Sequence, residues 1–144
     1  MDRAQLERLD DDGIGAWDRH DPDGFADMFA DQFVLEDWTV PEPIRNDKDA
    51  VRQYFRAWMT AFPDITIKRI DRVIDGNTVA GEVEFTGTNS GTLAMGGMEM
   101  PATNKAVRGR GTYFARANDE GKIVEFRSHP DAAGMMMQLG MMPM

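Results

Sequence analysis

The sequence predicts an α+β domain in which N-terminal helices pack on one face of a curved antiparallel sheet and form a cone with an open mouth. Two observations support this fold class. Helical periodicity fills most of the first half of the chain, whereas strand-like alternation dominates the second half. The pair Asp75-Gly76 between two alternating segments is a strong hairpin signal. Helices followed by strands are typical of an α+β domain, and 144 residues suit one domain spanning residues 1–144.

Three helices are expected before the sheet is complete. The first, over residues 2–19, carries an apolar face at helical spacing, formed by Leu6, Leu9, Gly13 and Trp17. A short second helix begins with Pro22 at its first position. The third is capped by Asn46 and ends at Pro63. It has the clearest apolar period of the chain, at Val51, Tyr54, Phe55, Trp58, Met59 and Phe62.

Alternating apolar residues predict strands at 33–38, 64–74, 77–87, 106–117 and 122–128. Residues 88–105 are expected to form a long loop or a broken strand, and long loops in compact domains are often functional. Pro130 is expected to stop the last strand. A short final helix should open at Asp131 and end at Gly140.

Composition excludes several classes of function. The net charge of −9 repels phosphate backbones and anionic membranes, so neither nucleic acid nor a membrane is an expected partner. The chain has no cysteine and two histidines, and neither metal-ligand spacing nor a phosphate-binding glycine loop is present. No metal and no cofactor are therefore expected. The acidic N-terminus is unlike a signal peptide, which favours a cytoplasmic protein.

Several segments, in the right order, resemble one known family. They are Phe62-Pro63-Asp64-Ile65, the hairpin from Asp75 to Ala80, residues 85–91, Pro101 with Thr103 and Lys105, residues 121–125, and Asp131 with Gln138-Leu139-Gly140. From about Asp18 to Gly140 the chain is similar to the SnoaL-like polyketide cyclases, also called ester cyclases, of the nuclear transport factor two-like superfamily. The resemblance implies the cone-shaped fold. It also implies a cyclase or isomerase that moves protons on an apolar, carbonyl-bearing molecule such as a polyketide, by aldol-type chemistry without metal or nucleotide.

The resemblance also implies site residues and alternatives. The acid that moves protons in the family matches Asp131, whereas Asn89 stands where many members have histidine. A ketosteroid-isomerase-like enzyme would use Asp37 as its base, although that family's oxyanion residues fall on Gly13 and near Thr112. The arginine of the epoxide hydrolase relay is matched by Arg110, but the acids of that relay fall on Thr112 and Ser128. A non-catalytic small-molecule-binding domain remains a further alternative, because one fold hosts many functions.

Four residues are candidates for catalysis, and each also has a structural interpretation. Asp131 could look into the cavity as a proton shuttle with a raised pKa, or could cap the last helix. Asp37 could be a base or a solvated charge, since alternation turns either it or Glu36 inward. His129 could pair with Asp131, but strand parity turns it away from the core.

Arg110 is the fourth catalytic candidate. It shares strand parity with Thr112 and Phe114, the expected cavity face, from which it would stabilise an enolate; otherwise it lies on the outer face and pairs with Glu82 or Glu84. Other residues are expected to bind substrate or to form plain core: Trp17, Trp38, Tyr54, Trp58, Phe62, Asn89, Thr112, Phe114 and Phe126. A homodimer through the outer sheet face is also expected.

Overall fold

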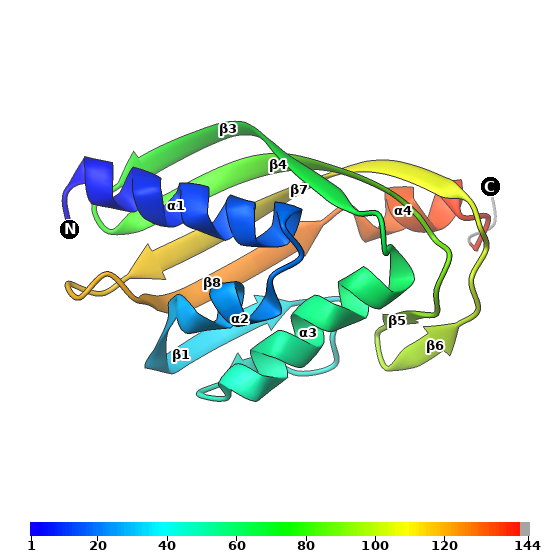
Figure 1. Ribbon diagram of the computed structural model, residues 1–144, viewed down its shortest axis with the longest axis horizontal. Coiled ribbons are helices and arrows are strands. Elements are labelled where there is room, and N and C mark those ends of the chain that lie inside the picture. The colour runs from blue at the N-terminus through cyan, green and yellow to red at the C-terminus, as the bar shows by residue number, and fades with distance from the viewer. Residues whose placement is uncertain (142–144) are drawn as a thin grey trace.

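A computed structural model describes residues 1–141 of the chain, and Figure 1 shows their arrangement as an α+β domain. The helices are α1 (Arg3–Asp18), α2 (Pro22–Asp27), α3 (Lys48–Ala61) and α4 (Ala132–Gln138). The strands of the main sheet are β1 (Phe29–Asp37), β2 (Ile44–Arg45), β3 (Thr66–Asp75), β4 (Thr78–Thr88), β7 (Ala106–Ala117) and β8 (Ile123–Pro130). Two short strands, β5 (Leu93–Met95) and β6 (Met98–Met100), form a separate hairpin.

The main sheet has the strand order β2-β1-β8-β7-β4-β3. Its strands pair antiparallel except β1 and β8, which run parallel. The sheet is therefore mixed, and the prediction of a wholly antiparallel sheet was wrong at this one pairing. The physical reason is that β1 and β8 are joined through most of the chain rather than by a hairpin, so β8 is free to enter the sheet beside β1 in the same direction.

Helix caps differ from the prediction at one site. Asp47, not Asn46, caps α3, because its side chain accepts a hydrogen bond from the backbone N–H of Ala50 at 3.1 Å. Asn46 has a left-handed backbone with φ of 57°, and its side chain accepts from the N–H of Phe33 instead. At the other end of the chain, β8 continues through Pro130, and α4 follows directly.

Helices α1, α2 and α3 cover one face of the curved sheet, as Figure 1 shows. Aromatic side chains fill much of the space between these layers, including Phe25, Phe29 and Phe55, which are fully buried. A second buried cluster lies at the other end of the sheet, around Phe62 and Met135. No helix among residues 1–141 is long and apolar enough to cross a membrane.

Residues 88–105, expected to be a long loop or a broken strand, contain the β5–β6 hairpin. Asn89 anchors both ends of this segment. Its fully buried side chain donates to the carbonyl oxygens of Ala61 and Gly91, at 3.1 and 2.9 Å, and accepts from the N–H and hydroxyl of Thr103. Because both polar atoms of its side chain are hydrogen-bonded in this way, Asn89 holds the hairpin against α3 and has a structural role.

Candidate active site

Helices α1, α2 and α3 and the inner face of the sheet enclose a cavity of about 120 Å³. One water molecule needs about 15 Å³ by the same kind of measure, so the space exceeds a packing defect. Most of the lining is apolar, and it includes seven aromatic side chains: Trp17, Phe25, Tyr54, Trp58, Phe85, Tyr113 and Phe126. Four of these, Trp17, Tyr54, Trp58 and Phe126, are residues that the sequence analysis named.

The cavity exists because β7 presents small residues to the helices. Gly109, Gly111 and Ala115 lie on the inward side of this strand. A Cβ atom at Gly109 would overlap the ring of Phe85 from the neighbouring strand β4, so glycine lets that ring lie across β7. Elsewhere along the inward side of β7, no large side chain fills the space until Tyr113.

Asp37 lies at the end of β1 with its side chain in the cavity wall. Phe33, Leu35 and Asp37 are the buried residues of the alternating pattern, so Glu36 is the residue that turns away. Asp37 is only 3% exposed, and three hydrogen bonds hold its carboxylate. The Thr39 N–H and hydroxyl donate to Oδ1 at 2.9 and 2.7 Å, and the hydroxyl of Tyr54 donates to Oδ2 at 2.7 Å.

All three donors to Asp37 are electrically neutral. Among residues 1–141, no lysine, arginine or histidine forms an ion pair with Asp37. Burial raises the pKa of Tyr54 well above its usual value, and the adjacent Asp37 carboxylate raises it further. Hydrogen bonds from Ser128 and Trp58 oppose that rise in pKa. Tyr54 therefore stays protonated and remains a hydrogen-bond donor at neutral pH.

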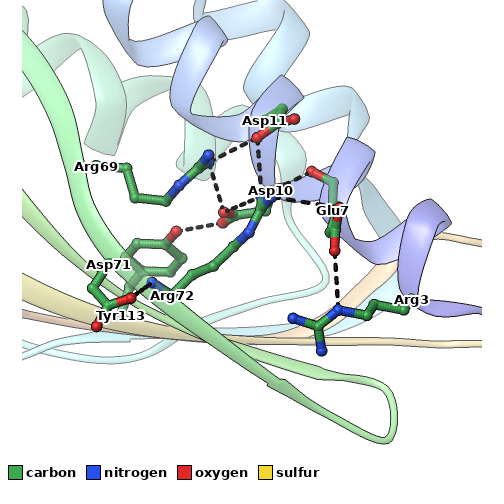
Figure 2. A network of polar contacts seen from close by, with 8 residues as sticks. All are labelled: Arg3, Glu7, Asp10, Asp11, Arg69, Asp71, Arg72 and Tyr113. Carbon is green, nitrogen blue, oxygen red and sulfur yellow. Dashed lines mark hydrogen bonds and ion pairs between the residues drawn. The ribbon is translucent and has the colours of Figure 1, made fainter.

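A second acid–tyrosine pair borders the same cavity, and sequence analysis did not identify it. Asp10 on α1 accepts a hydrogen bond from the hydroxyl of Tyr113 on β7, and both residues line the cavity. The other carboxylate oxygen of Asp10 lies 3.0 Å from Arg69 and 3.3 Å from Arg72. Figure 2 shows this network of ion pairs. Burial, followed by the hydrogen bond to Asp10, raises the pKa of Tyr113 well above its usual value.

Two backbone features let this second pair form. A register shift between Arg69 and Asp71 inserts an extra residue into β3, so Arg69 and Arg72 both face the helices despite being three residues apart. In β4, Gly81 lies directly opposite Tyr113 in the sheet register. A Cβ atom at Gly81 would overlap the phenol ring, so glycine is what lets that ring lean across β4 toward α1. In the sequence, Asp10 itself could have indicated the pair, because it is an acid that lies one turn from Leu6 on the apolar face of α1.

Strand β7 faces the opposite way to the prediction. Arg110 is half-exposed, and it forms ion pairs of 3.3 Å with Glu82 and 3.7 Å with Glu84 on the outer face of the sheet. Phe114 lies on that outer face too, under the guanidinium of Arg127 at 5.0 Å. Thr112 borders the cavity, although the residue is exposed. The expectation that Arg110 points into the cavity was therefore wrong.

Asp131 does not face the cavity. It is exposed, it is absent from the cavity lining, and its carboxylate accepts from the Gly134 N–H at 2.9 Å as the cap of α4. Alternation along β8 correctly predicted which side chains face the cavity. Phe126 and Ser128 line it, and His129 points away from it. The exposed His129 ring lies edge-on to Phe114, with 6.4 Å between ring centroids, and does not pair with Asp131.

Three aromatic or amide candidates also lie outside the inner cavity. Phe62 is buried in the second core cluster, where its ring stacks near Trp58 with centroids 6.4 Å apart. Asn89 is fully buried in the loop contacts described above. Trp38 is 85% exposed, although it directly follows the buried Asp37 in the chain. Of the four catalytic candidates, only Asp37 has its side chain in the wall of the inner cavity.

A curved mixed sheet with helices packed on one face, as described here, is the fold of the nuclear transport factor two-like and ketosteroid isomerase-like proteins. Solved structures agree over almost the whole chain. AclR from Streptomyces galilaeus, named as a candidate hydroxylase, has a TM-score of 0.82 at 21% identity and covers 99% of this chain and 100% of its own. TsrD from Streptomyces laurentii has a TM-score of 0.83 at 20% identity, covering 99% of each chain.

A third similar structure is IdmH from Streptomyces antibioticus, named as a candidate polyketide cyclase. Its TM-score is 0.71 at 24% identity, and the match covers 94% of this chain and 99% of IdmH. The model of the SnoaL-like polyketide cyclase family matches residues 11–139. The chain therefore belongs to the SnoaL-like polyketide cyclase family. No curated protein sequence matches it.

Proposed function

We propose that this protein is a cofactor-independent enzyme that moves protons within an apolar, carbonyl-bearing small molecule such as a polyketide, and so closes a ring or shifts a double bond. The observation that carries the proposal is Asp37. It is a buried carboxylate in the wall of an apolar cavity, and its hydrogen-bond partners are all neutral. A carboxylate held in this way takes up a proton without breaking an ion pair, which is what a general base requires.

Asp37 would remove a proton from the carbon next to a substrate carbonyl, and the electron pair of that C–H bond would pass into an enolate. In a cyclisation, the enolate carbon attacks a second carbonyl carbon of the same molecule and forms a C–C bond. The resulting alkoxide then takes the proton back from Asp37. In an isomerisation, Asp37 returns the proton to another carbon. Either series of steps leaves the enzyme unchanged and needs no oxidant or reductant.

Neighbouring residues support Asp37 in this scheme. Tyr54 and Thr39 fix the orientation of its carboxylate from two sides. The hydroxyl of Ser128 and the indole N–H of Trp58, which lie beside Tyr54 and line the cavity, are the neutral donors available to a developing enolate oxygen. Asp37 takes the proton-transfer task that the family resemblance assigns to Asp131, because Asp131 is exposed and caps a helix.

Proton transfer can be measured without the natural substrate. 2-Tetralone is an apolar bicyclic ketone, and NMR follows the exchange of its α-hydrogens for deuterium in D₂O. The wild-type protein should accelerate this exchange above the buffer rate. Asp37→Asn should reduce the protein-catalysed rate by about 10²- to 10⁴-fold, the usual worth of a general base. The amide fits the same space, so the melting temperature should change little.

The matched control is Asp131→Asn, which replaces an exposed acid by another good helix cap. This variant should retain the exchange rate within about twofold, since asparagine caps as well as aspartate. Full activity in Asp37→Asn, or its loss in Asp131→Asn, would contradict the assignment of the base to Asp37.

One observation favours a second function, a ligand-binding domain without catalysis. The hydrogen bond from Tyr54 to Asp37 joins α3 to β1, and the two from Thr39 hold the turn after β1, as they would around a purely structural carboxylate. In that case the wild-type protein would bind 2-tetralone, detected by calorimetry, without exchanging its α-hydrogens faster than buffer does.

A further inference from the structure

Trp38 is an exposed tryptophan that directly follows the buried Asp37, and its side chain does not line the inner cavity. Tryptophan is usually well buried in folded proteins, yet this side chain is 85% exposed. It lines a second hollow of about 180 Å³, together with Thr39, Met95, His129 and Ala132. The exposed indole is therefore part of a concave surface.

The second hollow adjoins the inner cavity at the candidate base. Asp37, Ser128 and Pro130 line both spaces. Asp37 and Ser128 are also direct partners in the parallel pairing of β1 with β8, so the sheet itself fixes the distance between them. The candidate base therefore belongs to the walls of both hollows.

The walls of the outer hollow are held in place by the fold. The N–H of Gly96 donates to the carbonyl oxygen of Thr39 at 2.6 Å, which ties the β5–β6 hairpin to the turn after β1 and brings Met95 to the hollow. The hydroxyl of Thr39 is in turn bound to Asp37 at 2.7 Å. On the opposite side, His129 belongs to β8 and rests edge-on against Phe114.

We propose that the outer hollow is a second subsite for the same substrate, and that it takes a planar, conjugated segment stacked on the indole of Trp38. Trp38 supplies a flat apolar face, Met95 supplies an adaptable apolar wall, and His129 can hydrogen-bond a carbonyl or hydroxyl oxygen of that segment. The carbonyl-bearing end of the substrate occupies the inner cavity. This inference rests on the proposed function, and it adds that the substrate is an elongated molecule with a planar, conjugated segment beyond its reacting end.

Three related probes test the subsite by titration calorimetry. 2-Naphthol fits the inner cavity alone, 6-phenyl-2-naphthol adds an aromatic ring, and 6-cyclohexyl-2-naphthol adds a saturated ring of similar size. The wild-type protein should bind the phenyl probe roughly three- to tenfold more tightly than 2-naphthol, the factor that one aromatic contact is worth. The cyclohexyl probe should gain less. Trp38→Ala should abolish the advantage of the phenyl probe while binding 2-naphthol as before.

The control variant is Met98→Ala, which truncates another exposed apolar side chain, on β6, that lines neither hollow. It should bind all three probes like the wild-type protein. The subsite would be overturned if Trp38→Ala weakened the binding of 2-naphthol and of the phenyl probe equally, or weakened the binding of neither. It would also be overturned if the wild-type protein bound the phenyl probe no more tightly than 2-naphthol. Exchange of 2-tetralone by the wild-type protein tests the proposed function separately, because that short ketone does not need the outer hollow.

Discussion

Two acid–tyrosine pairs border one cavity, and they differ in what else holds the carboxylate. Asp37 receives hydrogen bonds from Tyr54 and other neutral donors only. Asp10 receives one from Tyr113 and also forms ion pairs with two arginines, as Figure 2 shows. The two guanidinium groups belong to β3, so their ion pairs with Asp10 tie α1 to the sheet. The cavity therefore borders one acid whose ion pairs hold α1 on the sheet and one acid that only neutral donors contact.

The largest expected difference between the pairs is in stability. Asp10→Ala leaves the hydroxyl of Tyr113 and two guanidinium groups without their buried partner. The side chains of Arg69 and Arg72 are 27% and 19% exposed, so water compensates in part, and we expect the free energy of unfolding to fall by about 3 kcal/mol. Asp37→Ala removes hydrogen bonds from neutral donors and no ion pair, and should cost only about 1–2 kcal/mol. Urea denaturation of both variants measures the difference, and an equal or reversed order would contradict the comparison.

Gly81→Ala should disturb the Asp10 pair and spare the Asp37 pair. The added methyl group overlaps the ring of Tyr113, which must move away from α1. Overpacking of this kind should lower the free energy of unfolding by about 2 kcal/mol. In a Tyr113→Ala background the same substitution should cost almost nothing, because the clash is gone. A cost that is the same in both backgrounds would show that Gly81 matters for another reason.

Alkaline pH should destabilise the fold through both pairs. The chain has two tyrosines, and each has a pKa raised by burial and by its aspartate. Their stabilisation is complete below the unfolded pKa of about 10 and is lost as pH rises toward the folded values, by up to about 1.4 kcal/mol per pH unit for each tyrosine. Near-ultraviolet absorbance should therefore show tyrosinate only as the protein unfolds. Tyrosinate that forms near pH 10 in the folded protein would rule this out.

The smallest expected effect concerns Asp11, which shares the arginines of Asp10. A hydrogen bond from Arg69 is the main cause that lowers the pKa of Asp11 below its usual 3.8. Its stabilisation is therefore present above about pH 4 and is lost as pH falls through the lower folded value. Because the side chain is 54% exposed, Asp11→Asn should cost less than about 1 kcal/mol at neutral pH. Added salt should reduce that cost, and a cost that persists unchanged at pH 3 would contradict the ionic origin.

Sequence periodicity predicted the fold class and most element boundaries, because apolar spacing reports which face of an element is buried. The same reasoning failed on β7. Phe114 suggested that its side of the strand was inward, whereas the outward side is the one that carries Arg108, Arg110 and Arg116. Charge was the better guide there, since Phe114 is shielded on the outer face by the guanidinium of Arg127.

The two acids show where local reasoning stops. Asp37 was a candidate because alternation along its own strand limited the inward residue to Asp37 or Glu36. The Asp10 pair depends on an extra residue in β3 and on a glycine in β4. Those features bring together side chains from α1, β3 and β7, and none of these segments alone indicates the others. The exposed position of Asp131 likewise depends on where α4 packs, which the cap signal does not specify.

The parallel pairing of β1 with β8 means that the cavity wall around Asp37 is built from two segments that are synthesised at different times. Asp37 leaves the ribosome before its sheet partner Ser128, because it precedes Ser128 in the chain. The nascent chain therefore contains the Asp37 carboxylate before it contains β8, which forms part of the cavity wall around it. A protein shortened before Ile123 should contain every donor to Asp37 and still lack a working site.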